Sequence, residues 1–121
     1  MIALLMLVEL SATHGSLEVL RTYIAERSVP KYRAMDGLRL KVFLSDAADD
    51  AFGALYLFET ESALEAALPE LGSSVRERWG VTPRLQRFEV EAIVEGRHTT
   101  ADLSRVGHAV VHHAPAPSKA C

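Results

Sequence analysis

Cysteine is nearly absent from this chain, because its 121 residues include a single cysteine, Cys121, at the last position. One cysteine cannot form an intrachain disulfide, so a disulfide-stabilised secreted scaffold is excluded and a reducing cytoplasm is the expected compartment. An excess of positive charge is also lacking, since 13 lysines and arginines stand against 16 aspartates and glutamates. The net charge of −3 argues against a nucleic-acid partner, whose phosphates attract basic surfaces.

Long apolar runs and common catalytic motifs are lacking as well. The most hydrophobic segment, 2–10, reaches Glu9 and has neither the cationic start nor the cleavage site of a signal peptide. It is too short to span a membrane and is expected to be a buried strand, so no membrane partner is predicted. The chain has no glycine-rich phosphate loop, no H-E-x-x-H and no G-x-S-x-G, which leaves nucleotide, zinc-protease and serine-hydrolase functions without support.

The hydrophobic periodicity that is present alternates between strand and helix patterns. Pro30 is expected to kink the first helix, and Pro69 and Gly72 are expected to shorten the second. Ser16 and Ser62 are the expected helix caps. The predicted elements are strands at 2–10, 38–44, 54–58 and 84–94, helices at 16–35 and from 62, and a short helical turn at 73–79.

This βαββαβ order is typical of a ferredoxin-like plait, which is an α+β fold. Residues 1–95 are expected to form one domain, and residues 96–121, which lack a sustained period, a partly ordered C-terminal tail. Helices that cover one face of a four-stranded sheet leave the other face needing cover. The pattern therefore predicts a homodimer.

Residues 38–44 alternate between two kinds of side chain. Leucines and Val42 lie on one face of the predicted strand, and Arg39, Lys41 and Phe43 lie on the other. We expect the face with Lys41 to be covered, either as the seam between two subunits of the dimer or as the wall of a pocket. A covered lysine either pairs with a carboxylate, for which Glu89 and Glu91 are candidates, or loses its charge.

Three segments carry a likeness to a known family: VPKYRAMDGLRLKVFL, FGALYLFETESALEAAL and SSVRERWGVTPRLQRFEVEAIVE. They resemble the YdhR-type monooxygenase family of the dimeric α/β-barrel superfamily, which includes the antibiotic biosynthesis monooxygenases. The resemblance implies a homodimer whose two sheets pack face to face. It also implies a small-molecule enzyme, because relatives include cofactor-independent oxygenases that convert polyphenols into quinones, and decarboxylating, haem-degrading and cyclising enzymes.

Oxygenation without a cofactor requires an apolar pocket, a base, and donors that hold the resulting anion. His14, just ahead of the first helix, is the leading candidate base, although an exposed turn histidine fits the sequence equally. Tyr32, Arg33 and Lys41 are the candidates for holding the anion. Their alternatives are a packed tyrosine ring, a solvated arginine and a structural ion pair.

Four aromatic residues are candidates for substrate binding, and each also fits an ordinary hydrophobic core. They are Tyr23, Phe43, Tyr56 and Trp79. We expect His14, Tyr32 and Trp79 to converge on an apolar pocket between the helices and the sheet. Trp79 also suits a lid, because it lies in a short segment before Gly80.

Three histidines near the end of the chain, His108, His112 and His113, form an H-x3-H-H pattern. The first two would share one face of a helix, which suits a metal ion. No second cluster supports such a site, and Pro115 and Pro117 oppose the helix. No metal site is therefore predicted.

The sequence predicts a small cofactor-independent monooxygenase that acts on a hydrophobic polycyclic or polyketide-type metabolite. A cyclase or isomerase of a natural-product intermediate would need the same acid and base groups but no oxygen. A non-catalytic stress protein that binds a small molecule is the alternative from another class. No cofactor is expected.

Overall fold

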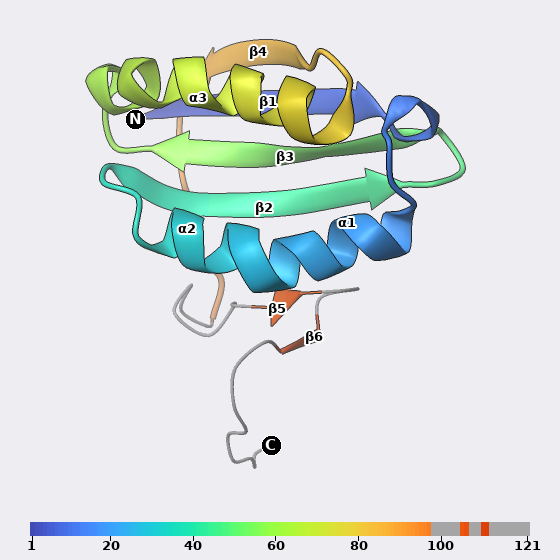
Figure 1. Cartoon of the computed structure of the whole chain (residues 1–121). Coiled ribbons are helices and arrows are strands. Elements are labelled where there is room, and N and C mark those ends of the chain that lie inside the picture. Colours follow the sequence, from blue (N-terminus) through green and yellow to red (C-terminus); the bar gives the residue numbers. More distant parts are fainter. Residues whose placement is uncertain (98–104, 107–109, 112–121) are drawn as a thin grey trace.

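The structure is a computed structural model that describes residues 1–97, 105–106 and 110–111. A four-stranded sheet and one layer of helices form the main body (Figure 1). The strands are β1 Ile2–Glu9, β2 Leu38–Asp46, β3 Ala51–Phe58 and β4 Arg84–Glu89. A 3₁₀ turn (Leu10–Ala12), α1 (Leu17–Tyr23), a π-helical segment (Ile24–Ser28), α2 (Val29–Arg33) and α3 (Glu61–Trp79) complete the body, and β5 (Arg105–Val106) pairs with β6 (Val110–Val111).

The four main strands form one antiparallel sheet in the order β2-β3-β1-β4. This order confirms the predicted α+β, ferredoxin-like βαββαβ fold. Figure 1 shows that the helices lie on one face of the sheet, with α1 and α2 in front of β2 and α3 in front of β1. The opposite face carries no helix among the described residues.

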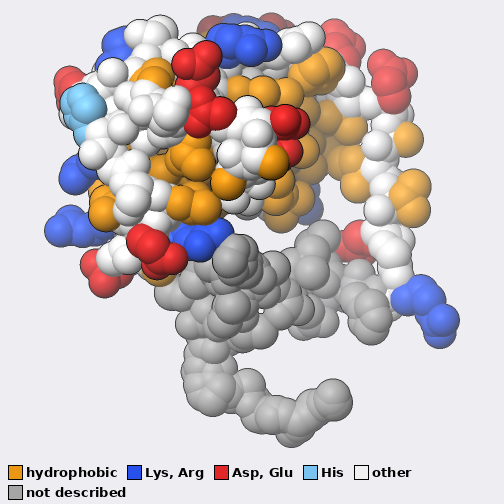
Figure 2. All heavy atoms as spheres, turned by 90° about the vertical axis from the view of Figure 1, so that its right-hand side faces the viewer, with side chains coloured by type: hydrophobic (Ala, Val, Ile, Leu, Met, Phe, Trp, Pro, Cys, Tyr) orange, Lys and Arg blue, Asp and Glu red, His pale blue; other side chains and the backbone are white. Residues whose placement is uncertain are grey.

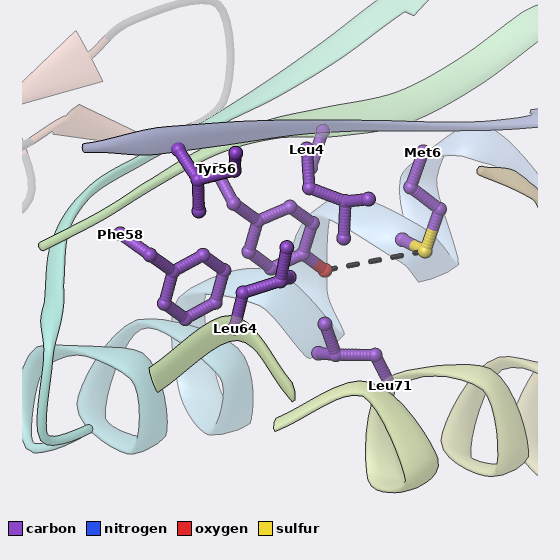
Figure 3. Close-up of a cluster of buried hydrophobic side chains, with 8 residues drawn as sticks. Leu4, Met6, Tyr56, Phe58, Leu64 and Leu71 are labelled. Atoms are coloured by element: carbon purple, nitrogen blue, oxygen red, sulfur yellow. Dashed lines mark hydrogen bonds between the residues drawn. The ribbon is translucent and has the colours of Figure 1, made fainter. Parts of the chain in front are cut away.

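The hydrophobic core lies between the sheet and the helices. Every second residue of β1 is buried there, as the period of a strand requires. Tyr56 and Phe58 of β3 are fully buried with Leu64 and Leu71 of α3 (Figure 3). The fold is thus held mainly by apolar side chains from β1, β3 and α3.

The first helical segment is continuous from Leu17 to Arg33, with a π-helical turn before the proline. Ser16 caps it as predicted, because its side chain accepts a hydrogen bond of 3.3 Å from the Val19 N–H. Pro30 lacks an N–H and would clash with the carbonyl four residues earlier in an α-helix. The wider π turn over Ile24–Ser28 precedes that clash and carries the chain past the proline.

The second helix differs from the prediction. It begins after Thr60, whose hydroxyl accepts a hydrogen bond of 3.1 Å from the Ala63 N–H, so Ser62 is not the cap. It also runs unbroken through Pro69 to Trp79, where Gly80, at φ 75°, ends it. Leu64 and Leu71 are buried on one side of this helix, and that burial outweighs the local cost of the proline.

The last strand is shorter than the predicted 84–94. Glu89, the final residue of β4, lies opposite Ile2, the first residue of β1, so the residues after it have no partner strand in the described part of the chain. The chain then leaves the sheet and passes behind it, on the side away from the helices (Figure 1). Residues 91–97 are all exposed.

The two faces of β2 are the reverse of the expected ones. Lys41 lies opposite Tyr56 and Phe43 lies opposite Ala54, so these side chains lie on the helix-covered face. Of the two expected covers for the Lys41 face, the dimer seam was therefore wrong, and the face forms part of a pocket wall. Strand alternation groups residues by face but does not say which face the helices cover, and here the purely aliphatic face is the open one.

Candidate functional site

A cavity of about 60 Å³ lies between the sheet and the helical layer. Side chains from β1, β2, β3, α1, α2, α3 and the π-helical segment line it. Six of the eight predicted site residues are among them: Tyr23, Tyr32, Lys41, Phe43, Tyr56 and Trp79. These six residues supply five of the six aromatic rings and one of the two lysines of the cavity wall.

Lys41 places its amine among aromatic rings of this wall. Its Nζ lies 3.3 Å from the ring centroid of Tyr32, 4.3 Å from that of Phe43 and 4.4 Å from that of Tyr56. Strand register explains two of these contacts, because Tyr56 is opposite Lys41 and Phe43 is two residues further along the same face. We call Tyr32, Phe43 and Tyr56 the aromatic cage.

The aromatic cage is held together by edge-to-face ring contacts. The Tyr32 centroid lies 6.0 Å from that of Tyr56 and 6.4 Å from that of Phe43. Tyr56 also stacks on Phe58 at 5.9 Å, and its hydroxyl lies 4.0 Å from the Met6 sulfur (Figure 3). The cage is thus part of the hydrophobic core and holds the amine in one place.

The charge state of Lys41 follows from this environment. Burial disfavours the ammonium and, together with the nearby positive charge of Lys31, lowers the pKa of Lys41 to about 6. Glu70 opposes this shift but does not cancel it. In the described part of the chain, no carboxylate forms an ion pair with Lys41. The expected partners Glu89 and Glu91 therefore do not pair with it.

The two tyrosines of the cage stay protonated at neutral pH. Burial raises the pKa of Tyr32, and the positive charge of Lys31 offsets only part of this effect. Burial also raises the pKa of Tyr56, to which the neighbouring Tyr32 adds. Both phenols can therefore donate hydrogen bonds to an anion that forms beside Lys41.

Lys31 and Glu70 form an ion pair between α2 and α3 at the edge of the cavity. Burial alone would lower the pKa of Lys31, but the hydrogen bond and charge of Glu70 outweigh it and raise that pKa. Both side chains are at least one-third exposed, so the pair contributes little to stability. Near Lys41, the effect of the positive charge of Lys31 is larger than that of the negative charge of Glu70, so the pair lowers the pKa of Lys41.

A second aromatic contact lies at the other end of the cavity. The Tyr23 and Trp79 rings meet edge to face at 5.3 Å, and the Arg78 guanidinium lies 4.5 Å from the Tyr23 centroid. These contacts join α1 to the last turn of α3. Trp79 is therefore a wall residue in a helix.

His14 and Arg33 do not line the cavity. His14 is exposed, its N–H donates a 2.9 Å hydrogen bond to the Trp79 carbonyl, and its imidazole packs against Gly80. Thr13, which directly follows the 3₁₀ turn after β1, lines the cavity instead of His14. The side chain of His14, the next residue, is exposed. The expected convergence of His14, Tyr32 and Trp79 thus holds for the tyrosine and the tryptophan only.

Two polar residues near the cavity were missed in the sequence. Lys31 lies within the segment VPKYRAMDGLRLKVFL, but its role beside Lys41 follows only from the packing of α2 on the sheet. Glu70 lies far from it in sequence, on α3. No periodicity pointed to this pair, because the contact joins two helices across the cavity.

The described residues contain no group of three or more histidine, cysteine or acidic side chains placed to hold a metal ion. The H-x3-H-H pattern of His108, His112 and His113 lies outside the described residues. None of the helices in the described ranges combines the length and hydrophobicity needed to cross a bilayer.

Lys41→Met is expected to stabilise the fold, because it replaces a buried amine with an apolar side chain of similar length. The folded pKa is about 6 and the unfolded one 10.5, so wild type is penalised most at low pH and gains stability as pH rises between these values. The variant should gain at least about 1 kcal/mol in the free energy of unfolding at pH 7. Urea unfolding at pH 6 and pH 9 checks this, and an equal gain at both would contradict it.

Comparison with known proteins gives the fold a context. The sequence matches no protein-family profile and no curated protein. A solved protein of unknown function from Nitrosomonas europaea is similar in structure, with a TM-score of 0.60 and 18% identity over 80% of this chain and 95% of that one.

Two further solved structures have functional descriptions. A proposed antibiotic biosynthesis monooxygenase from Deinococcus radiodurans has a TM-score of 0.56 and 13% identity, over 81% of this chain and 100% of the other. SnoaB, a cofactor-independent oxygenase from Streptomyces nogalater, gives the same TM-score and identity over 78% and 97%. At such identities, the likeness shows that this chain shares the fold of antibiotic biosynthesis monooxygenase-like proteins.

Proposed function

We propose that this protein is a cofactor-independent monooxygenase whose substrate is a hydrophobic, fused-ring phenol or a related polyketide-type compound. The observation that carries the proposal is the Lys41 amine, which three aromatic rings enclose at the wall of a cavity and which pairs with no carboxylate of the described residues. Burial lowers its pKa to about 6. Such a group is a base at neutral pH, as this chemistry requires. The fold shared with SnoaB supports the same reaction class.

In the proposed reaction, Lys41 removes a proton from an activated C–H or O–H group of the substrate. The amine becomes an ammonium, which the faces of the surrounding rings stabilise and which then holds the substrate anion. The hydroxyls of Tyr32 and Tyr56 can donate hydrogen bonds to the same anion. The anion reacts with dioxygen, so that an activated CH₂ group and O₂ give a C=O group and water.

The size of the cavity adds a requirement. About 60 Å³ is well below the several hundred that a drug-sized ligand fills, so a fused-ring substrate needs its edge to open. Two contacts join the helical segments that border the cavity: the Lys31–Glu70 ion pair joins α2 to α3, and the Tyr23–Trp79 contact joins α1 to α3. We propose that entry separates one of them.

Oxygen uptake tests the proposed function. The protein, purified without added cofactor or metal, is mixed with a series of anthrones and fused-ring phenols while dissolved oxygen and quinone absorbance are recorded. Turnover with one ¹⁸O atom from ¹⁸O₂ in the product supports a monooxygenase. Catalytic conversion without oxygen uptake would favour a cyclase or isomerase, and binding without conversion a small-molecule-binding stress protein.

The open sheet face supports a homodimer. Strand register places Leu5, Leu55 and Val42 in one row across this face, and Leu7 and Leu44 in the next. Val42, Leu44 and Leu55 are 38–43% exposed, which is unusual for a sheet interior. Figure 2 shows a column of chain that stands off from the body, with hydrophobic side chains exposed on the body beside it. We propose that a second copy packs on this face.

Leu55→Lys is expected to convert the dimer to a monomer at micromolar concentration, because it places a charge in the centre of the apolar face. Val19→Lys is the matched control: Val19 is 52% exposed, but on α1 at the helical side. Sedimentation should give a dimer for wild type and Val19→Lys, and a monomer for Leu55→Lys. Monomeric wild type would remove the proposal.

We also propose a family and a cellular location for this protein. Membership of the YdhR-type family is supported by the three segments quoted above. A cytoplasmic location is supported by the single cysteine of the chain.

A further inference from the structure

Lys41 has the surroundings of a nucleophile as well as those of a base. The residue lines the cavity, its Nζ lies among the three rings of the aromatic cage, and no carboxylate of the described residues pairs with it. Lysines become nucleophilic at neutral pH when they are desolvated or lie near another cation. Here both conditions are met, because three rings surround the amine and the Lys31 ammonium lies 5.1 Å from the centroid of the same Tyr32 ring.

We propose that Lys41 is a carbonyl-reactive amine, which condenses with an aldehyde or ketone in the cavity to form an imine. The inference shares its cavity with the proposed function but requires a covalent bond that proton transfer does not.

The step balances with groups on the cavity wall. The Nζ lone pair attacks the carbonyl carbon, and one proton of the amine passes to the oxygen, for which the hydroxyl of Tyr32 on the cavity wall can act as a relay. The resulting carbinolamine loses water, and the C=N bond replaces the C=O bond. The products are one imine and one water, and no oxidant or cofactor is consumed.

The groups that face Lys41 come from three elements. Lys31 and Tyr32 lie on α2, Tyr56 on β3 and Glu70 on α3. Lys31 favours the free amine, and Glu70 opposes it. An imine of this kind makes the adjacent C–H group more acidic. We therefore expect the ligand to be a 1,3-dicarbonyl compound, the repeating unit of a polyketide chain, whose reactions begin at that C–H group.

The sequence offers internal controls, since it contains only three lysines, Lys31, Lys41 and Lys119. The native protein is treated at pH 6 and pH 7 with acetaldehyde, which is small enough for the cavity, and the imine is reduced with cyanoborohydride. Peptide mapping then measures N-ethylation at each lysine. A second arm uses pentane-2,4-dione, whose enaminone with an amine absorbs in the near ultraviolet.

Lys41 should carry at least about tenfold more label than Lys119 at pH 7, and a larger excess at pH 6, where ordinary lysines are almost fully protonated. The dione absorbance should be lost in Lys41→Arg, which keeps a cation, and retained in Arg39→Met, which removes an exposed cation from the same strand. Equal labelling of the three lysines, or no label at Lys41 with both probes, would overturn the proposal. If Lys41 takes no label but oxygen uptake is still lost in Lys41→Met, the imine is rejected and the proton-transfer role stands, since proton transfer needs no covalent bond.

Discussion

Lys41→Met is expected to lower the turnover of a fused-ring phenol by at least about 100-fold at pH 7, the scale on which a positioned base acts. Methionine fills the same volume without a lone pair that accepts a proton at this pH, so the aromatic cage remains and the base is lost. The wild-type rate should rise with pH through about 6, because Lys41 must be uncharged to act. Oxygen uptake across pH 5–9 measures both effects.

Two variants make this result specific. Arg39→Met removes a cation from the same strand, but Arg39 is exposed and pairs with Glu59, so its turnover should match wild type. His14→Ala removes the base that the sequence favoured, and its exposed position predicts turnover close to wild type. A loss of about 100-fold in His14→Ala, with full activity in Lys41→Met, would assign the base to His14.

Gly53→Ala is expected to destabilise the fold by about 3 kcal/mol or more, and to lower Tm by roughly 10 °C. A Cβ at this position would lie 1.9 Å from the Met6 carbonyl oxygen and 2.9 Å from its carbon. These are backbone atoms of β1, which cannot rotate away, so the two central strands must separate locally. Thermal unfolding followed by circular dichroism measures the change.

Gly96→Ala is the matched control for this substitution. A Cβ on Gly96 meets nothing within 4 Å, so the free energy of unfolding should stay within about 0.5 kcal/mol of wild type. If Gly53→Ala were equally neutral, the close approach of β3 to β1 would be wrong. Turnover in Gly53→Ala should fall at least in proportion to the fraction of protein that remains folded. Gly53 also lines the cavity, so the shift of the strands changes the cavity wall.

The fold was predictable because each element carries its own period. Alternate residues of β1 are buried, and Ser16 caps the first helix as the local chemistry requires. The errors came where tertiary packing overrides local preference. Pro69 does not break α3, because apolar residues on both sides of it pack on the sheet, and β4 ends at Glu89 because β1 offers no further partner.

The candidate site was predictable by residue type but not by position. Six of the eight candidates, five aromatic residues and a lysine, line one cavity, and their roles there remain predictions. Periodicity placed Lys41 and Phe43 together, but it could not say that this face meets the helices. His14 fitted the chemistry on the basis of its ordinary pKa alone, whereas its outward direction depends on the 3₁₀ turn after β1.

The central claim is that Lys41 is an uncharged amine at neutral pH, and its titration tests this claim most directly. Three lysines give three side-chain Hε–Cε signals in a ¹³C-labelled sample, and Lys41→Met assigns the relevant one. The account predicts that this signal titrates near pH 6, whereas the pKa of Lys31, which burial alone would lower, is raised by its hydrogen bond to Glu70. A Lys41 signal that titrates near 10.5, like an ordinary lysine, would contradict it.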